Sequence, residues 1–250
     1  MPFFDMHTHL PSESSDLWRD WNRAAVLAEM DEVAVDKAVV MTLDGLAYDP
    51  ERGNDIVHDA CQDSGGRLVP VGSADPRRPD AARELERCAE RGFRGIKLHP
   101  WMQGFSPLES YMTPVAQAAI ATGLPFIIHD GTPPYASPLQ IAMLAERFPE
   151  LTVVLAHGGL FDLWEDSAAA ANRLPNVHIT MCGTASMEVF RCLIEAVPVA
   201  KLSMGTDGGF GDADLRRHRR AVQELILADL DPEDAAAIGH RNAERLLGYS

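Results

Sequence analysis

Two histidines that stand one residue apart near the beginning of the chain are the first candidates for chemistry. His7 and His9 end the apolar run Phe3–His9. Successive side chains on a strand point to opposite faces, so these two imidazoles would share a face and could reach one ion. A pair of this kind also occurs in proteins without a metal, so a metal site requires further ligands elsewhere in the chain.

Further ionisable side chains stand where later apolar runs end. They are Lys97 and His99, His129, His157 and Asp207. Glycine follows each of the last three within two residues, which lets the backbone turn sharply there. Imidazoles together with a carboxylate form a mixed nitrogen and oxygen donor set, which suits Zn²⁺ and also Mn²⁺, Fe²⁺ or Co²⁺. The sequence therefore predicts a divalent metal site, with Zn²⁺ as the first choice.

The elements that must position these residues repeat eight times. Apolar, β-branched runs occupy Phe3–His9, Lys37–Leu43, Leu68–Ala74, Phe93–His99, Pro125–His129, Thr152–His157, Val177–Cys182 and Lys201–Asp207. Amphipathic helical patterns alternate with them, at Leu17–Val35, Asn54–Ser64, Asp80–Arg91, Tyr111–Thr122, Pro138–Phe148, Leu163–Leu174, Met187–Val197 and Asp212–Asp229. Nearly continuous hydrophobic strands joined by helices indicate a parallel sheet that is covered on its outer face. Eight such units predict an α/β fold, a (β/α)₈ TIM barrel, whose functional residues stand at the carboxyl ends of the strands.

One domain over residues 1–250 is expected, because no linker or low-complexity tract interrupts this pattern. A further helical region opens at Asp231-Pro232-Glu233 and ends with Arg241–Leu247. A doubly wound open sheet is the competing architecture, and it predicts a glycine-rich phosphate loop after the first strand. The chain has Thr8-His9-Leu10-Pro11 at that point, which favours the barrel.

The balance of charge and the cysteines restrict the partners and the compartment. A formal net charge of −15 argues against nucleic acid and anionic membranes, both of which bind basic surfaces. The four cysteines show no C-x-x-C pattern, which indicates free thiols in a reducing compartment. No apolar run approaches the ~20 residues of a membrane span, and the first strand begins too early for a leader. We therefore expect a cytoplasmic protein that acts on a small molecule, with an outer helix face that could support a homodimer.

The ordered set of motifs resembles the amidohydrolase superfamily of metal-dependent hydrolases. The residues that carry the resemblance are Asp5-Met6-His7-Thr8-His9, His129, His157 and Thr206-Asp207. More narrowly, the chain is similar to the amidohydrolase-related branch that includes aminocarboxymuconate-semialdehyde decarboxylase, resorcylate decarboxylase and several lactonases. Two more segments resemble that branch, a strand-4 signature at residues 95–100 and a closing helix at residues 239–248. The resemblance spans residues 3 to 248.

This resemblance implies roles for individual residues. The metal ligands would be His7, His9, His129 and Asp207. Asp207 would also shuttle protons, and His157 would be a catalytic group beside the metal that polarises the substrate or orients water. A water activated by the metal near neutral pH would then attack a carbonyl carbon. Asp5 shares the face of the first two ligands but lies deeper, so we expect it to support them.

Lys97 leaves two interpretations open. Strand alternation puts Lys97 and His99 on the inward face. Two-metal members of the superfamily carry a carboxylated lysine at this position, in which case His129 and His157 would bind a second ion. Otherwise the ammonium group neutralises Asp5 or binds a substrate carboxylate. We favour the second interpretation and one ion per chain, because the narrower branch is mostly mononuclear.

Aromatic residues in the loops after the strands are the candidates for the substrate pocket. Trp101 follows the fourth strand, Tyr135 the fifth, Phe161 the sixth and Phe210 the eighth. Aromatic side chains at these places could clamp a planar ring, although loop aromatics also form lids that do not contact a substrate.

The expected function is metal-dependent hydrolysis of a small carbonyl compound, such as a lactone, cyclic amide or ester. The alternative is a lyase, a non-oxidative decarboxylase of an aromatic or unsaturated carboxylic acid that uses the same site. Hydrolysis is favoured because larger decarboxylases of the branch usually carry insertions that this compact chain lacks. A third hypothesis, a barrel that binds a ligand without turnover, is weakened by the complete set of expected ligands.

Overall fold

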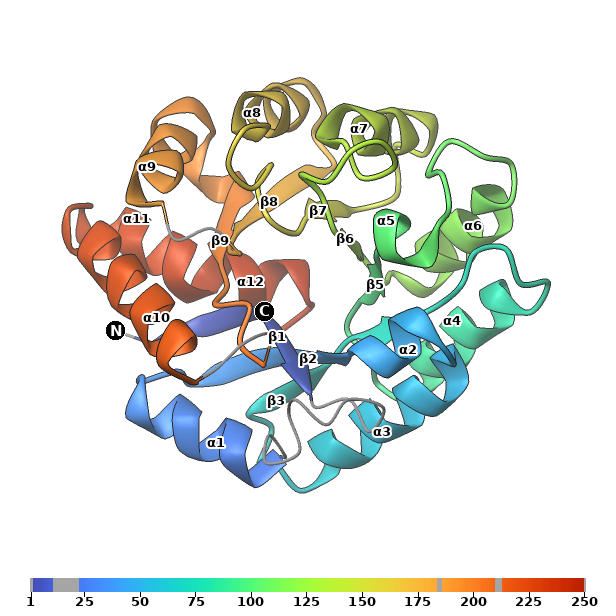
Figure 1. Cartoon of the computed structure of the whole chain (residues 1–250), viewed down its shortest axis with the longest axis horizontal. Helices are drawn as coiled ribbons and strands as arrows, with labels where there is room; N and C mark the ends of the chain where they lie inside the picture. The colour runs from blue at the N-terminus through green and yellow to red at the C-terminus, as the bar shows by residue number, and fades with distance from the viewer. Residues whose placement is uncertain (1, 11–22, 184–185, 210–212, 250) are drawn as a thin grey trace.

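A ring of parallel strands forms the centre of the molecule (Figure 1). The computed structural model describes residues 2–10, 23–183, 186–209 and 213–249. The strands are β1 (Phe4–Leu10), β2 (Lys37–Thr42), β3 (Leu68–Pro70), β4 (Gly72–Ser73), β5 (Ile96–Leu98), β6 (Phe126–Ile128), β7 (Val153–Leu155), β8 (Val177–Met181) and β9 (Leu202–Met204). They pair in the orders β1-β2-β3 and β4-β5-β6-β7-β8-β9, and every pair is parallel.

Two junctions complete the ring. Only Val71 separates β3 from β4, and its N–H donates to the carbonyl of Val40 at 3.0 Å, so β3 and β4 form one interrupted strand. At the other junction Thr8 of β1 forms a parallel bridge with Gly208, just beyond β9. The N–H of His9 donates to the carbonyl of Gly208 at 2.7 Å. The parallel barrel that the sequence predicts is thereby confirmed.

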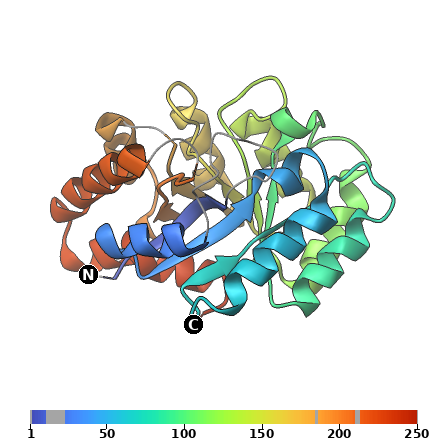
Figure 2. The same cartoon turned by 60° about the horizontal axis from the view of Figure 1, so that its bottom comes forward.

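Helices cover the outer face of the ring (Figures 1 and 2). The helices of the described residues, including shorter ones at the two ends of the barrel, are α1 (Arg23–Glu32), α2 (Leu43–Ala47), α3 (Pro50–Gln62), α4 (Ala81–Glu90), α5 (Pro100–Gln103), α6 (Met112–Thr122), α7 (Pro138–Arg147), α8 (Trp164–Arg173), α9 (Met187–Ala196), η2 (Val199–Lys201), α10 (Ala213–Ala228), α11 (Pro232–Ala236), the π-helix η3 (Ala237–Arg241) and α12 (Asn242–Leu246). A parallel pair of strands needs a crossover connection, and these helices supply it. The predicted helical residues 17–22 and 212 lie outside the described residues.

Two short helices that the sequence pattern did not predict follow β2 and β5 directly. At the start of α2 the hydroxyl of Thr42 accepts the N–H of Asp44 at 3.2 Å. At the start of α5 Nδ1 of His99 accepts the N–H of Met102 at 3.3 Å, and Pro100 occupies the first turn. Such caps stabilise a single turn, which is too short to show a helical periodicity. Both helices lie at the carboxyl end of the barrel, where they shape its mouth.

The interior of the barrel is filled by apolar side chains near its amino-terminal end. Inward-facing residues such as Met6, Val39 and Ile127 are fully buried, and they belong to one cluster with Ala243 and Leu247 of the closing helical region. A packed interior is usual for this fold. The polar inward-facing residues therefore lie at the opposite, carboxyl end. In the described part of the chain, no helix is long and apolar enough to cross a bilayer.

Candidate metal centre

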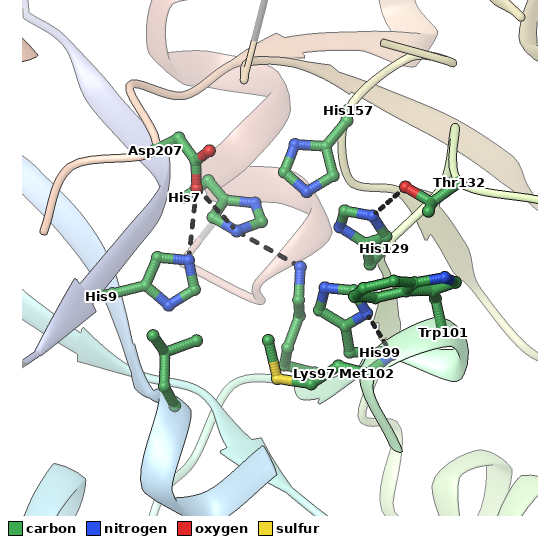
Figure 3. Close-up of a pocket in the computed structure, with 11 residues that line it drawn as sticks. His7, His9, Lys97, His99, Trp101, Met102, His129, Thr132, His157 and Asp207 are labelled. Atoms are coloured by element: carbon green, nitrogen blue, oxygen red, sulfur yellow. Dashed lines mark hydrogen bonds and ion pairs between the residues drawn. The ribbon is translucent and has the colours of Figure 1, made fainter. Parts of the chain in front are cut away.

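Three side chains from the two strands that close the ring converge at the carboxyl end of the barrel. His7 and His9 belong to β1, and Asp207 follows β9 (Figure 3). Oδ1 of Asp207 lies 3.6 Å from Nε2 of His7 and 3.3 Å from Nε2 of His9. All three side chains are buried, and one donor atom from each lies within 4.8 Å of the other two. One divalent cation can therefore contact all three residues.

The charge states of these residues suit a cation. Burial, together with the charge of Lys97, holds the pKa of His7 well below its usual range, so its imidazole is neutral. Burial by itself raises the pKa of Asp207, but a hydrogen bond with His9 and the charges of Arg219 and Lys97 outweigh it, and the carboxyl stays ionised. Nδ1 of His7 is buried without a hydrogen-bond partner among the described residues. A neutral imidazole at His7 and an ionised carboxylate at Asp207 are the forms that bind metal, so these residues fit the expected ion.

Asp5 holds the main chain of the two segments that carry these three ligands, β1 and the residues after β9. Its carboxylate accepts the N–H of His7 at 3.1 Å and the N–H of Thr206 at 2.8 Å. It also accepts the hydroxyls of Thr8 at 3.0 Å and of Thr206 at 2.6 Å. Nη2 of Arg216 on α10 donates to the same carboxylate at 3.1 Å. Asp5 therefore acts on the main chain of β1 and of the segment after β9, and its bonds do not run to the imidazole rings.

A polar face of α10 holds the segment that carries Asp207. Nη1 of Arg219 donates to the carbonyls of Thr206 and Asp207, both at 3.0 Å. Nε2 of Gln223 donates to the carbonyl of Gly205 at 2.6 Å. Asp207 itself has φ of +56°, a left-handed conformation that is uncommon for a residue other than glycine. The three bonds from α10 stabilise this backbone, which turns the carboxylate into the cavity.

His157 follows β7 and is held by buried polar groups. The carboxylate of Asp130 accepts the main-chain N–H of His157 at 2.6 Å. Nδ1 of the imidazole lies 3.4 Å from Sγ of Cys182, which is itself 3.0 Å from the carbonyl oxygen of Ala156. Burial holds the pKa of the His157 imidazole well below the usual range of histidine. Burial also holds the pKa of the Cys182 thiol well above the usual range of cysteine, so both groups are uncharged. Donor atoms of His7, His157 and Cys182 also lie within 4.8 Å of one another.

His99 and His129 form another part of the cavity wall. Their rings are stacked, with centroids 3.7 Å apart and an interplanar angle of 13°. Nε2 of His129 and Oγ1 of Thr132 are hydrogen-bonded at 2.9 Å, and the His129 ring lies 4.5 Å from that of His157. His129 thus lines the cavity but is not part of the close group around Asp207. Its assignment as the fourth metal ligand stays a prediction.

Lys97 projects from β5 into the same cavity. Its Nζ lies 3.3 Å from Nε2 of His7, and its side chain is buried (Figure 3). Burial lowers the pKa of Lys97 to about 8. The cation that contacts Asp5 is Arg216, so the expectation that Lys97 neutralises Asp5 is wrong. Its carboxylation and a second ion stay predictions.

The cavity enclosed by these groups has a volume of about 210 Å³. It is lined by His7, His9, Leu43, Lys97, His99, Trp101, Met102, His129, Thr132, His157 and Asp207. Leu43 and Met102, which belong to the two short helices, were not predicted, although Leu43 directly follows a strand and could have been inferred from that position.

One of the four predicted pocket aromatics lies in the cavity wall. Trp101 lines the cavity and is 54% exposed at its edge. Tyr135 and Phe161 are exposed by 43% and 60% and do not belong to the cavity lining among the described residues. Phe210 lies outside the described residues. Substrate contacts of these three therefore stay predictions.

The family of the chain follows from its sequence. A family model described as amidohydrolase matches residues 4–249, and the chain belongs to this family. The resemblance drawn from the ordered histidines and the aspartate is thereby confirmed, and the protein is an enzyme of the amidohydrolase superfamily. No curated protein matches the chain.

Several solved structures share the whole fold. The 2,6-dihydroxybenzoate decarboxylase from Rhizobium matches with a TM-score of 0.77 and 18% identity over 99% of each chain. The 5-carboxyvanillate decarboxylase from Sphingomonas paucimobilis matches with a TM-score of 0.75 and 19% identity over 99% of each chain. A dihydroxybenzoic acid decarboxylase from a Polaromonas species, with bound manganese and the inhibitor 2-nitroresorcinol, has a TM-score of 0.76 and 17% identity, covering 99% of this chain and 97% of that one.

These matches correct the expectation of hydrolysis. The named enzymes among them are decarboxylases, so they favour the alternative function over the hydrolysis of a lactone, cyclic amide or ester. The expected insertions do not separate this chain from the decarboxylases, because the match covers 97–99% of their length.

Proposed function

We propose that this protein is a metal-dependent, non-oxidative decarboxylase of a small aromatic or unsaturated carboxylic acid. The observation that carries the proposal is the position of Lys97, whose Nζ lies 3.3 Å from His7 in a cavity that also holds His9 and Asp207. Lys97 is the one lysine or arginine among the described residues that line this cavity. A fixed cation beside a metal site is suited to hold an anionic substrate.

The size and shape of the cavity suit a single ring. An apolar cavity of roughly 150 Å³ can hold benzene. The cavity described above has about 210 Å³, which leaves room for one ring and a carboxylate. The stacked imidazoles of His99 and His129 and the indole of Trp101 offer flat surfaces for such a ring. Monocyclic hydroxybenzoates are therefore the first substrates to test.

The reaction breaks the bond between the ring carbon and the carboxylate carbon. Carbon dioxide leaves, the electron pair stays on the ring carbon, and a proton must be added there. When bound by His7, His9 and Asp207, with His129 as the predicted fourth ligand, the divalent ion would supply positive charge that orients the substrate and stabilises negative charge. Zn²⁺ is the ion that we propose, with Mn²⁺ as a replacement, since manganese is bound in the Polaromonas structure.

The residues of the chain would handle the anion and the proton. The Lys97 ammonium group would pair with the substrate carboxylate or a neighbouring phenolate, which fixes the ring in the cavity. His157 lies against the same space, and the cavity-facing nitrogen of its ring can accept a proton. Asp207 also borders the cavity, and its ionised carboxylate can take up the proton of a ring hydroxyl of the substrate. This proton, held at Asp207 or passed on to His157, would then be added to the ring carbon as carbon dioxide leaves.

The test is turnover of hydroxybenzoates by protein that has been stripped of metal and then reloaded. Chelation should abolish the release of carbon dioxide, and Zn²⁺ or Mn²⁺ should restore it. Lys97→Met should raise KM about 10- to 100-fold, because a hydrogen bond to a charged group contributes roughly 1.5–3 kcal/mol. Lys37→Met, at the other end of the barrel, is the control and should leave KM unchanged. Full turnover by metal-free protein would overturn the proposal.

Other expectations stay predictions. We propose that residues 1–250 form one domain, that the protein acts in the cytoplasm, and that its partner is a small molecule, without nucleic acid or membrane. A homodimer through an outer helix face is also proposed. Size-exclusion chromatography with light scattering tests the last of these directly.

A further inference from the structure

We propose that Cys182 is a positioning residue that sets the tautomer of His157, so that Nδ1 carries the ring proton and Nε2 is bare. The proposal rests on the proposed function only for the use of His157 in turnover. Cys182 follows β8 and His157 follows β7, and both are buried. No motif in the sequence links them.

The thiol of Cys182 has a single proton, and its two neighbours decide where that proton points. Sγ of Cys182 lies 3.0 Å from the carbonyl oxygen of Ala156 and 3.4 Å from Nδ1 of His157. A carbonyl oxygen can only accept a hydrogen bond, so the short contact with Ala156 uses the single S–H. The sulfur is then an acceptor toward the imidazole. Nδ1 must donate, and the neutral ring has its proton on Nδ1.

The ring fits at this place because residue 183 is glycine. Gly183 has φ of +79°, and a side chain at this position would put its Cβ 2.7 Å from Nδ1 of His157. The carboxylate of Asp130 accepts the main-chain N–H of His157 at 2.6 Å and so fixes the backbone of this residue. Glycine at position 183 thus lets the Nδ1 edge of the imidazole lie against Cys182, and the bond to Asp130 fixes the main chain of His157.

The consequence concerns Nε2. In the Nδ1–H tautomer Nε2 has a free lone pair, which can accept a proton or contact a cation. His157 lines the cavity, and its ring centroid lies 4.7 Å from that of His7 (Figure 3). A ring with the opposite tautomer would present an N–H in place of this lone pair. Cys182 thus leaves His157 with a ring nitrogen that can accept a hydrogen bond or contact a cation in the cavity.

The experiment reads the tautomer without turnover. Protein with ¹⁵N-labelled histidine, loaded with diamagnetic Zn²⁺, is examined by long-range ¹H–¹⁵N correlation, and His157→Gln assigns the signals of the ring. Wild type and Cys182→Ser should show the Nδ1–H tautomer, because serine keeps one donor and one acceptor. Cys182→Ala should show a mixture or the Nε2–H tautomer. Cys192→Ala, which removes a half-buried thiol of α9, is the control and should match wild type.

Turnover separates this proposal from the proposed function. With a hydroxybenzoate substrate, Cys182→Ala should lower kcat about 10-fold or more with little change in KM, in line with the effect of removing a group that orients a ligand or catalytic histidine. Cys182→Ser should restore most of kcat. An Nε2–H tautomer in wild type, or an unchanged Nδ1–H tautomer in Cys182→Ala, would overturn the role of Cys182. The expected tautomers without any carbon dioxide release would overturn the proposed function alone.

Discussion

The main-chain N–H of Asp207 donates to the carbonyl oxygen of His7 at 2.8 Å, and the side chains of the same two residues approach to 3.6 Å. The first contact closes the barrel between its first and last strands. The second brings two expected metal ligands together. Closure of the barrel and assembly of the site therefore depend on the same pair of residues, and a change that separates these strands should weaken both.

Gly205→Ala tests this dependence. A Cβ at position 205 would lie 2.8 Å from Cβ and 2.9 Å from the main-chain N of His7, so the two strands would have to move apart. We expect a loss of about 1–3 kcal/mol in the free energy of unfolding, which is typical of overpacking, and a weaker Kd for Zn²⁺. Urea denaturation and metal titration measure the two effects. Gly95→Ala is the less crowded comparison, because its added Cβ would lie 3.3 Å from its nearest neighbour, the carbonyl oxygen of Pro125. Normal metal affinity in a destabilised Gly205→Ala protein would show that closure and site are independent.

Arg219→Gln tests how α10 supports Asp207. The substitution removes two hydrogen bonds, each at 3.0 Å, to the carbonyls of Thr206 and Asp207. Affinity for Zn²⁺ should fall about 10- to 100-fold, as for other groups that hold a metal ligand in place. Competition with a chromophoric chelator measures it. Arg217→Gln removes an exposed arginine of the same helix that pairs with Glu32 and Asp214, and it should bind Zn²⁺ as wild type does. Equal affinities in both variants would contradict the role of Arg219.

Gly183→Ala and Gly123→Ala form a matched pair. Both glycines have a left-handed backbone, with φ of +79° and +71°, so alanine strains both. The added Cβ at position 183 would lie 2.7 Å from Nδ1 of His157, whereas nothing lies within 4 Å at position 123. Stability should fall by about 1 kcal/mol or more in each, but only Gly183→Ala should lose kcat. Similar kcat in the two variants would mean that the position of His157 does not limit turnover.

The stability of the protein should fall in acid partly because of His178. Burial, assisted by the charges of Lys201 and Arg245, lowers the pKa of His178 from 6.5 to about 4. Between these values the unfolded chain binds the proton and the folded chain does not, so stability rises with pH. The stability that the folded protein owes to an uncharged His178 is present in full above pH 6.5 and is lost as the pH falls through about 4. His178→Gln should reduce the acid-induced loss in the free energy of unfolding by an amount on the order of 2 kcal/mol. Parallel pH profiles of urea midpoints for the two proteins would contradict it.

The barrel and most of its polar mouth could be predicted from the sequence. Eight hydrophobic runs gave the parallel strands, and alternation along β1 placed His7 and His9 together. Asp207 could be predicted because it ends an apolar run of the sequence in the order that the family shows. These inferences depend on local periodicity and chain order, which a sequence displays directly.

The remaining features depend on contacts between distant segments. Arg216, Arg219 and Gln223 look like the solvent-exposed face of a polar helix, yet they face the segment after β9 and are mostly buried. Charged side chains are rarely buried without partners, and the sequence does not show those partners. The contact between Cys182 and His157 joins two strands and has no local signal. The choice between hydrolysis and decarboxylation rested on chain length, which says nothing about the chemistry of the cavity.

The most direct test of decarboxylation follows the carboxyl carbon. Zn²⁺-loaded protein is incubated in deuterated water with monocyclic hydroxybenzoates that carry ¹³C in the carboxylate, and the gas and the ring product are analysed by mass spectrometry. Decarboxylation predicts ¹³CO₂ in equal amount to a phenol with one new deuterium on the ring, and neither product in chelated protein. Consumption of a substrate with the ¹³C label retained in a non-volatile product would contradict it.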